Sequence, residues 1–188
     1  MGTPKKLSYI TVAEYLKGER GAEVKHEYVD GEVYAMAGES RRHNRITSNF
    51  ILLFRDNLSE TNCEAYFEGV KVQVNKSTFY YPDVLVTCET EIEDDNYVIK
   101  YPGLIVEVLS PSTAATDKRE KLIAYKLIES LQEYAIVWQE EMRVELHRRQ
   151  NDGWLTFFYT QPEDEIEFAS INLRTTAANI YRNINFEQ

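Results

Sequence analysis

The sequence predicts a mixed α/β fold in a single domain that spans residues 1–188. Helical and strand periodicities alternate along its middle, in the order helix, three strands, helix, strand. The second helical segment allows the two strands that flank it to pair in parallel. No internal repeat or Pro/Gly-rich linker marks a second domain. The expected segments are 40–58 for the first helix, 65–74, 81–88 and 104–109 for the strands, 113–131 for the second helix and 134–138 for the last strand.

Cap and turn residues place the ends of these elements. Ser40 suits the N-cap of the first core helix, and Ser112 or Thr113 suits that of the second. Thr-Val-Ala-Glu from Thr11 forms a capping box, and Asp-Gly at 30–31 fits a hairpin turn. The expected flanking elements are a helix over 11–17, a hairpin over 24–37, strands over 143–149 and 154–160, and a helix over 176–182.

The composition is that of a globular chain. Apolar residues make up 43% and aromatic residues 12%, which is too apolar for a disordered polymer. No segment reaches the ~18–20 apolar residues of a transmembrane helix, and the N-terminus lacks the apolar core of a signal peptide. We therefore expect a cytoplasmic protein without a membrane partner. Cys63 and Cys88 are too few for a disulfide framework, so reduced thiols are expected.

The net charge of −10 argues against general adhesion to nucleic acid. Most of this charge comes from two stretches, 89–95 with a net charge of −5 and 151–188 with −4. The rest of the chain is nearly neutral. Nucleic acid therefore stays open as a partner, although no strong basic stripe is evident in the sequence.

Two acidic residues interrupt apolar runs that otherwise resemble buried strands. Asp83 precedes Val-Leu-Val, and Glu107 lies within Ile-Val-Glu-Val-Leu. Such a carboxylate is costly unless it is paired, hydrogen-bonded or bound to a metal. If the two strands are neighbours, both carboxylates converge on one divalent cation, for which Mg²⁺ is suited and Mn²⁺ is a second option. For Asp83, backbone amides or an arginine such as Arg45 offer an equally good explanation.

The helix that follows Glu107 carries a lysine that can reach the same site. Asp117, Lys121 and Tyr125 are spaced by four residues and therefore line one side of the helix. Lys121 could place its ammonium beside an attacking water or a scissile phosphate. An ordinary surface Asp–Lys pair explains the same spacing equally well.

His43 and Glu27 are weaker candidates. His43 could contact a phosphate or a site carboxylate, and a half-buried structural histidine is an equal alternative. Glu27 lies beside the hairpin turn, where acids are usually solvated. The histidines lack zinc-ligand spacing, and segment 89–95 lacks the pattern of an EF-hand loop. Glycine-rich phosphate loops and a nucleophile elbow are absent from the sequence, which argues against kinases, dinucleotide enzymes and serine hydrolases.

The order of these residues resembles the PD-(D/E)XK nucleases, and more closely a branch of restriction endonuclease-like proteins. The likeness runs from about Tyr9 to Arg149 and includes the turn between Glu27 and Glu32. Pro-Asp alone has almost no weight, but the combined order and spacing are specific. The motifs that carry the likeness are Gly38-x-Ser40-x-x-His43, Pro82-Asp83, Glu107–Ser112 and Asp117…Lys121…Tyr125 leading into Glu133-Tyr134.

The resemblance implies a restriction endonuclease-like core over about 40–140, with added β-hairpins. It also implies a Mg²⁺-dependent endonuclease that hydrolyses phosphodiester bonds of DNA, or in some members RNA, often as a homodimer. By resemblance, Asp83 and Glu107 are the metal ligands. The full set of catalytic candidates is Asp83, Glu107, Lys121, His43, Glu27 and Tyr125.

The chain departs from the superfamily pattern at two places. Leu109 stands where a lysine is expected two residues after the glutamate, so catalysis depends on Lys121 as a migrated lysine. The acid often found on the first core helix has no counterpart near His43. The alternative is therefore a catalytically silent binding or assembly module. Two results would favour this alternative: a protein that binds no divalent cation, and a Glu107→Gln change that is neutral or stabilising. A metal-independent glycosidase is a third option without further support in the sequence.

Overall fold

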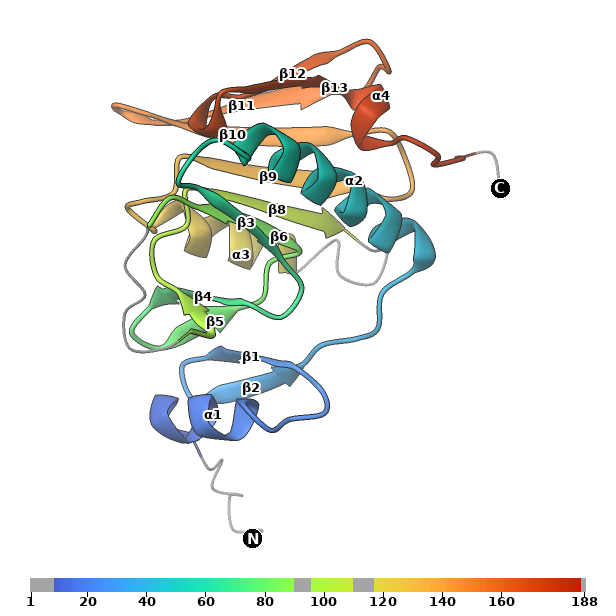
Figure 1. Cartoon of the computed structure of the whole chain (residues 1–188). Helices are drawn as coiled ribbons and strands as arrows, with labels where there is room; N and C mark the ends of the chain where they lie inside the picture. Colours follow the sequence, from blue (N-terminus) through green and yellow to red (C-terminus); the bar gives the residue numbers. More distant parts are fainter. Residues whose placement is uncertain (1–8, 90–95, 110–116, 187–188) are drawn as a thin grey trace, which may run out of the picture.

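The computed structural model describes residues 9–89, 96–109 and 117–186, apart from the side chains of 117–119. The expected caps Ser112 and Thr113 lie outside the described residues. Two main sheets and a short hairpin form the framework (Figure 1). One sheet has six strands in the order β11-β10-β9-β8-β6-β3, and the other has five in the order β2-β1-β5-β4-β7.

The strands follow the expected order along the chain, with additional short strands. They are β1 His26–Val29, β2 Glu32–Ala35, β3 Glu64–Phe67, β4 Lys71–Asn75, β5 Thr78–Tyr80, β6 Val84–Thr87, β7 Val98–Ile99, β8 Leu104–Leu109, β9 Glu133–Trp138, β10 Val144–Gln150, β11 Gly153–Tyr159, β12 Glu165–Phe168 and β13 Leu173–Thr176. The helices are α1 Val12–Glu19, α2 Arg41–Leu58, α3 Asp117–Lys126, α4 Ala177–Ile180 and the 3₁₀ turn Ala169–Ile171.

The predicted mixed α/β core is confirmed. In the six-stranded sheet, α2 is followed by β3, β6 and β8, and α3 leads to β9, which pairs in parallel with β8. Strand β6 is antiparallel to β8, with Val84 opposite Val106. If this register continues by one residue, Asp83 stands opposite Glu107. The pairing of β6 with β8 thus brings the two predicted metal ligands side by side.

Layers on both faces bury the six-stranded sheet. Helix α2 covers one face together with β12, β13 and α4, and α3 with the five-stranded sheet covers the other (Figure 1). Ile46, Phe50 and Phe54 of α2 are fully buried, and each such side chain contributes about 1.5–3 kcal/mol of burial free energy. Ser40 caps this helix by accepting the amide hydrogen of His43.

Two expected boundaries were wrong. The single strand expected over 65–74 is split into β3 and β4, which belong to different sheets. Glu68 and Gly69 separate them with φ values of 38° and 100°, a left-handed conformation that no continuous strand allows. Helix α3 ends at Lys126 instead of continuing to residue 131, and the chain turns through 3₁₀-type hydrogen bonds at Leu127 and Ile128.

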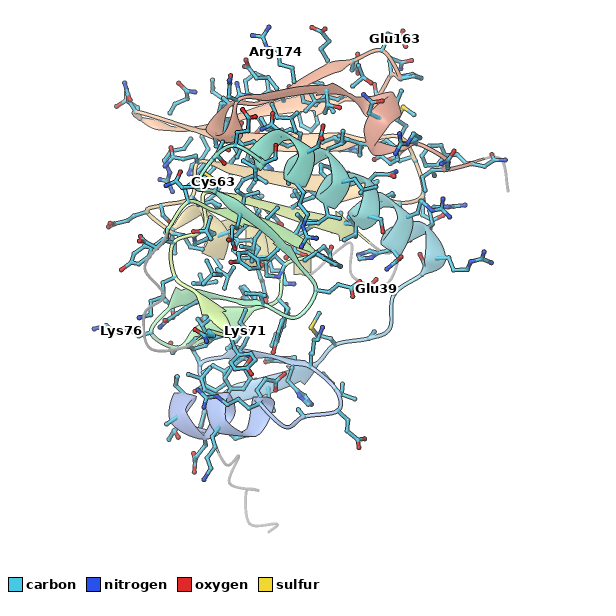
Figure 2. All side chains as sticks on the ribbon, in the orientation of Figure 1. Glu39, Cys63, Lys71, Lys76, Glu163 and Arg174 are labelled. Atoms are coloured by element: carbon cyan, nitrogen blue, oxygen red, sulfur yellow. A yellow bond between two sulfur atoms is a disulfide. The ribbon has the colours of Figure 1, made fainter. Side chains whose placement is uncertain are left out.

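The cysteines also differ from the prediction of reduced thiols. Cys63 and Cys88 form a disulfide that joins β3 to the end of β6 (Figure 2). The strand register explains the contact, because Glu64 pairs with Thr87 and the next pair outward is Cys63 with Cys88. The sequence alone does not show that these two strands are neighbours.

Glu133 anchors β9 to the 3₁₀ turn. Its fully buried carboxylate accepts hydrogen bonds from Arg148 Nε at 2.8 Å, Ala169 N at 3.1 Å, Ser170 N at 2.8 Å and Ser170 Oγ at 2.6 Å. Removing the charge of such an acceptor weakens several hydrogen bonds at once.

We expect Glu133→Gln to lower the free energy of unfolding by about 2–3 kcal/mol, because the new amide turns a donor toward groups that need an acceptor. Urea unfolding followed by circular dichroism measures this change. Glu163→Gln, at an exposed position labelled in Figure 2, is the matched control and should leave stability unchanged. Equal stability of the two variants would contradict the anchoring role.

Among the residues that the structure describes, every helix is too short or too polar to cross a lipid bilayer.

Candidate active site

A cavity of about 600 Å³ brings together the candidate residues. Its wall includes parts of both sheets, the link between β2 and α2, and the start of both core helices. Figure 2 labels Glu39 on that link. Polar and charged side chains of its wall include Glu27, Glu39, Ser40, His43, Asp83, Glu107, Lys121 and Gln139.

Asp83 is fixed at the cavity by two contacts to one oxygen. Its Oδ2 accepts the amide hydrogen of Val108 at 2.6 Å and lies 3.1 Å from His43 Nε2. Backbone and histidine, not Arg45, therefore satisfy this oxygen. Within the described part of the chain the second oxygen, Oδ1, has no partner. The side chain is 13% exposed, so this oxygen is available to a ligand in the cavity.

Glu107 is held in a similar way from the side of α3. Its Oε1 accepts the hydroxyl hydrogen of Tyr125 at 2.9 Å and lies 3.5 Å from Lys121 Nζ. The other oxygen, Oε2, has no partner among residues 9–89, 96–109 and 117–186. Each strand carboxylate thus has one oxygen engaged by the protein and one oxygen left for another ligand.

Lys121 is shared between two carboxylates. Its Nζ lies 2.7 Å from Glu27 Oε1, closer than its 3.5 Å to Glu107 Oε1. Glu27 also accepts the amide hydrogen of Tyr81 at 3.2 Å, and the ammonium lies 5.3 Å from the centre of the Tyr80 ring. Glu27, which the sequence ranked low, therefore positions the lysine that the sequence ranked high.

Burial and neighbouring charges together shift the pKa values of Glu107 and Lys121. Removal from water raises the pKa of the Glu107 carboxyl; Lys121 and the Tyr125 hydroxyl oppose this rise, while Asp83 and Glu27 add to it. Burial alone would lower the pKa of Lys121, but the carboxylates of Glu107 and Glu27 outweigh it and raise the pKa. The site thus holds more acidic groups than its one lysine balances, which suits a divalent cation.

A fourth acid, Glu39, reaches the site from the link that precedes α2. Glu39 Oε2 lies 3.5 Å from His43 Nε2, one residue before the N-cap of α2. Helix α2 itself has no acid in its first turn, as expected from the sequence, but Glu39 on the link before the helix brings a carboxylate to His43. Burial tends to lower the pKa of His43, but its hydrogen bond to Asp83 and the charges of Asp83, Glu39 and Glu107 raise it overall.

Glu39, His43 and Asp83 form the one group of three or more metal-ligating residues found among the described residues. One ligand atom from each lies within 4.8 Å of the others. Glu107 is not a member of this group, so Glu39 and His43 offer Asp83 an alternative set of ligand partners beside the Asp83–Glu107 pair predicted from the sequence. Hard carboxylate oxygens and one imidazole suit Mg²⁺ or Mn²⁺.

Ser40 and Gln139 also line the cavity. The Ser40 hydroxyl donates to Gln139 Oε1 while it caps α2. Gln139 follows directly after β9 and is buried, so its amide is held in one orientation at the cavity. Sequence reasoning missed this residue, because a glutamine after a strand carries no signal of its own.

Replacing Ser40 with alanine is expected to remove both contacts and to lower the free energy of unfolding by about 1–2 kcal/mol, since it deletes an N-cap. Thermal unfolding should show a decrease of a few degrees in Tm for a chain of this length. Ser40→Thr retains a hydroxyl and serves as the control. A Tm of Ser40→Ala equal to that of the wild type would contradict this account.

The structure gathers all six sequence candidates around one site. Glu27, His43, Asp83, Glu107 and Lys121 line the cavity, and Tyr125 contacts Glu107 from behind. Leu109, at the position of the usual lysine, is a buried core residue. Asp117 is outside the described side chains, so its predicted place beside Lys121 stays a prediction.

A family model described as "Uma2: Putative restriction endonuclease" matches residues 12–178 of the chain. The chain belongs to the Uma2 family. Two Synechocystis proteins are similar to this Uma2 chain over nearly its whole length. Protein slr1290 is 39% identical over 175 residues, which are 92% of each chain. Protein sll1609 is 35% identical over 168 residues, which are 87% of this chain and 95% of that protein.

A solved structure shares the fold of this Uma2 protein. It comes from Anabaena variabilis and is described as "a putative nuclease belonging to DUF820". The TM-score is 0.76 at 18% sequence identity, and the match covers 92% of this chain and 97% of the other. The restriction endonuclease-like fold implied by the sequence resemblance is therefore confirmed.

Proposed function

We propose that this Uma2 protein is an endonuclease that hydrolyses phosphodiester bonds of DNA with the help of Mg²⁺ or Mn²⁺. One observation carries the proposal: Lys121 of α3 extends into the same cavity as the strand carboxylates Asp83 and Glu107. The lysine missing at position 109 is thereby replaced by an ammonium from the helix. The family description and the shared fold support the same reaction class.

Asp83 and Glu107 are the proposed ligands of the cation, through the oxygens that the protein leaves free. The bound cation would supply positive charge for the phosphate and a more acidic water at the site. Val108 N and His43 hold Asp83 in place, and Tyr125 holds Glu107. These contacts fix both carboxylates before substrate binds, so little reorganisation is needed during the reaction.

Lys121 has the role of stabilising negative charge on the reacting phosphate and of orienting the attacking water. Glu27 Oε1 lies 2.7 Å from the ammonium and so positions it. Glu39 and His43 lie beside Asp83 and are candidates for ligating the same cation or a second one. His43 otherwise orients Asp83, which makes it a positioning residue.

Incubating the purified protein with supercoiled and single-stranded DNA tests the proposal. Nicked or linear products should form with Mg²⁺ or Mn²⁺ and should be absent in EDTA. Cleavage that persists unchanged in EDTA would refute the metal dependence. An inactive wild-type protein under all these conditions would refute the nuclease function.

A catalytically silent binding or assembly module is the second candidate. Two observations favour it. Lys121 lies 2.7 Å from Glu27 and so has an ionic partner when no metal is bound. Leu109, at the position of the usual lysine, is a buried core residue. This alternative predicts that divalent cations do not raise the melting temperature of the protein. It also predicts that Glu107→Gln is neutral or stabilising.

A further inference from the structure

The outward face of α2 carries a row of arginines in an otherwise acidic chain. Arg41, Arg45 and Arg55 are exposed, whereas Ile46 and Phe50 of the same helix are buried against the sheet. With 3.6 residues per turn, the three arginines fall within about 80° of one another around the helix axis. We call these three residues the arginine row.

The charge of the row is largely uncompensated. Helix α2 carries four arginines and a single acid, Asp56, in a protein of net charge −10. Arg42 is engaged by Glu140 at 2.8 Å. In the described part of the chain neither Arg41 nor Arg45 forms an ion pair or a side-chain hydrogen bond. Arg55 lies 5.5 Å from the centre of the Phe67 ring, a contact that leaves its charge unpaired.

The row begins at the candidate active site. Arg41 precedes His43 by two residues, and His43 Nε2 lies 3.1 Å from Asp83 Oδ2. At a rise of 1.5 Å per residue, the row extends about 21 Å away from the site along α2. This length corresponds to about six nucleotides of one DNA strand at 3.4 Å per nucleotide.

We propose that the arginine row is the surface on which a DNA duplex docks, with the guanidinium groups on the phosphates of one strand. The inference rests on the proposed nuclease function, since it names where the substrate lies beside the cavity. Guanidinium groups recognise phosphate through paired hydrogen bonds. Phe50 and Phe54 of α2 are buried, and Phe67, which is exposed, lies against Arg55. Single-strand binders stack successive bases on several exposed rings, so this single ring beside Arg55 is a poor platform for them.

Salt-dependent DNA binding tests the docking surface. The triple variant Arg41→Gln/Arg45→Gln/Arg55→Gln and the wild type are titrated with a fluorescent DNA duplex of about 20 base pairs in EDTA, so that no cleavage occurs. The variant should bind at least about tenfold more weakly at 0.1 M salt. The slope of log K against log salt should fall by about 2–3, since each lost phosphate contact removes about 0.9.

A charge-matched variant separates local contacts from net charge. Lys17→Gln/Lys76→Gln/Arg174→Gln removes three exposed positive charges from α1, the β4–β5 turn and β13; Figure 2 labels Lys76 and Arg174. For this variant, the slope of log K against log salt should differ from that of the wild type by less than about 1. Equal effects of the two triple variants would overturn the proposal. Tighter row-dependent binding of single-stranded DNA or duplex RNA than of duplex DNA would overturn the choice of partner.

A small substrate distinguishes failure of this inference from failure of the proposed function. Mn²⁺-dependent hydrolysis of bis(4-nitrophenyl) phosphate should be unchanged in the arginine-row variant, because the cavity is intact. Loss of this activity in the variant would show that the row acts on the site itself and would overturn a pure docking role. Row-dependent DNA binding by a wild-type protein that hydrolyses neither substrate would support the docking surface and refute the nuclease function.

Discussion

Glu107→Gln and Asp83→Asn should each lower DNA cleavage by about a thousandfold or more, or about 4 kcal/mol of transition-state stabilisation. Each change keeps the size of the side chain and removes one of the two carboxylates proposed to hold the cation. The contacts from Tyr125 and Val108 position these groups but cannot replace their charge. Initial rates of plasmid nicking at saturating Mn²⁺ measure the loss.

Glu133→Gln is the matched control for these two variants. Glu133 is also a buried carboxylate of the six-stranded sheet, but it does not line the cavity, and its carboxylate is bonded instead to Arg148 and to the 3₁₀ turn at Ser170. The Glu133→Gln variant should have a lower free energy of unfolding but should retain the wild-type cleavage rate at a temperature where the protein is folded. Activity within tenfold of the wild type in both Glu107→Gln and Asp83→Asn would contradict their role as ligands.

Lys121→Met should lower cleavage by about 10²–10³-fold, the usual effect of removing one group that stabilises transition-state charge. It should also destabilise the metal-free protein by about 3 kcal/mol, because Glu27 and Glu107 then lose their shared cation in a buried place. The side chain of Lys121 is 15% exposed, so water screens the pair only weakly. Urea unfolding in EDTA measures this second effect.

The metal should partly rescue the stability of Lys121→Met. A divalent cation at Asp83 and Glu107 supplies positive charge beside the carboxylate that the lysine has left, and ligand binding to the folded state stabilises it. The stability difference from the wild type should therefore shrink when Mn²⁺ replaces EDTA. The conservative change Lys121→Arg keeps the charge and should show a smaller loss in EDTA. An equal loss of stability in EDTA and in Mn²⁺ would show that Lys121 does not interact with the metal site.

The main elements of the site could be predicted from local sequence. Asp83 and Glu107 are conspicuous because each interrupts an apolar run of the sequence, and the pairing of β6 with β8 places them side by side. Lys121 and Tyr125 follow from helical spacing, since both contact Glu107 from the same side of α3. The two-residue period of strands and the four-residue spacing along one side of a helix are enough to predict that these residues belong to the site.

Other features depend on contacts that no local pattern encodes. Glu27 meets Lys121 across 94 positions of the chain, and the five-stranded sheet that brings it there was not predicted as a separate sheet. Glu39 lies before the helix instead of on it, so the search for an acid among helical positions missed it. The Cys63–Cys88 disulfide and the break at Glu68 follow from strand register and backbone conformation.

A crystal structure of the protein soaked in Mn²⁺ tests the central claim most directly. Anomalous scattering locates Mn²⁺ without reference to the protein coordinates. We predict a peak bridging the carboxylates of Asp83 and Glu107 at about 2.0–2.2 Å from an oxygen of each, with Lys121 Nζ nearby. The absence of any peak at Glu107, whether or not a peak is held by Glu39, His43 and Asp83, would contradict the account.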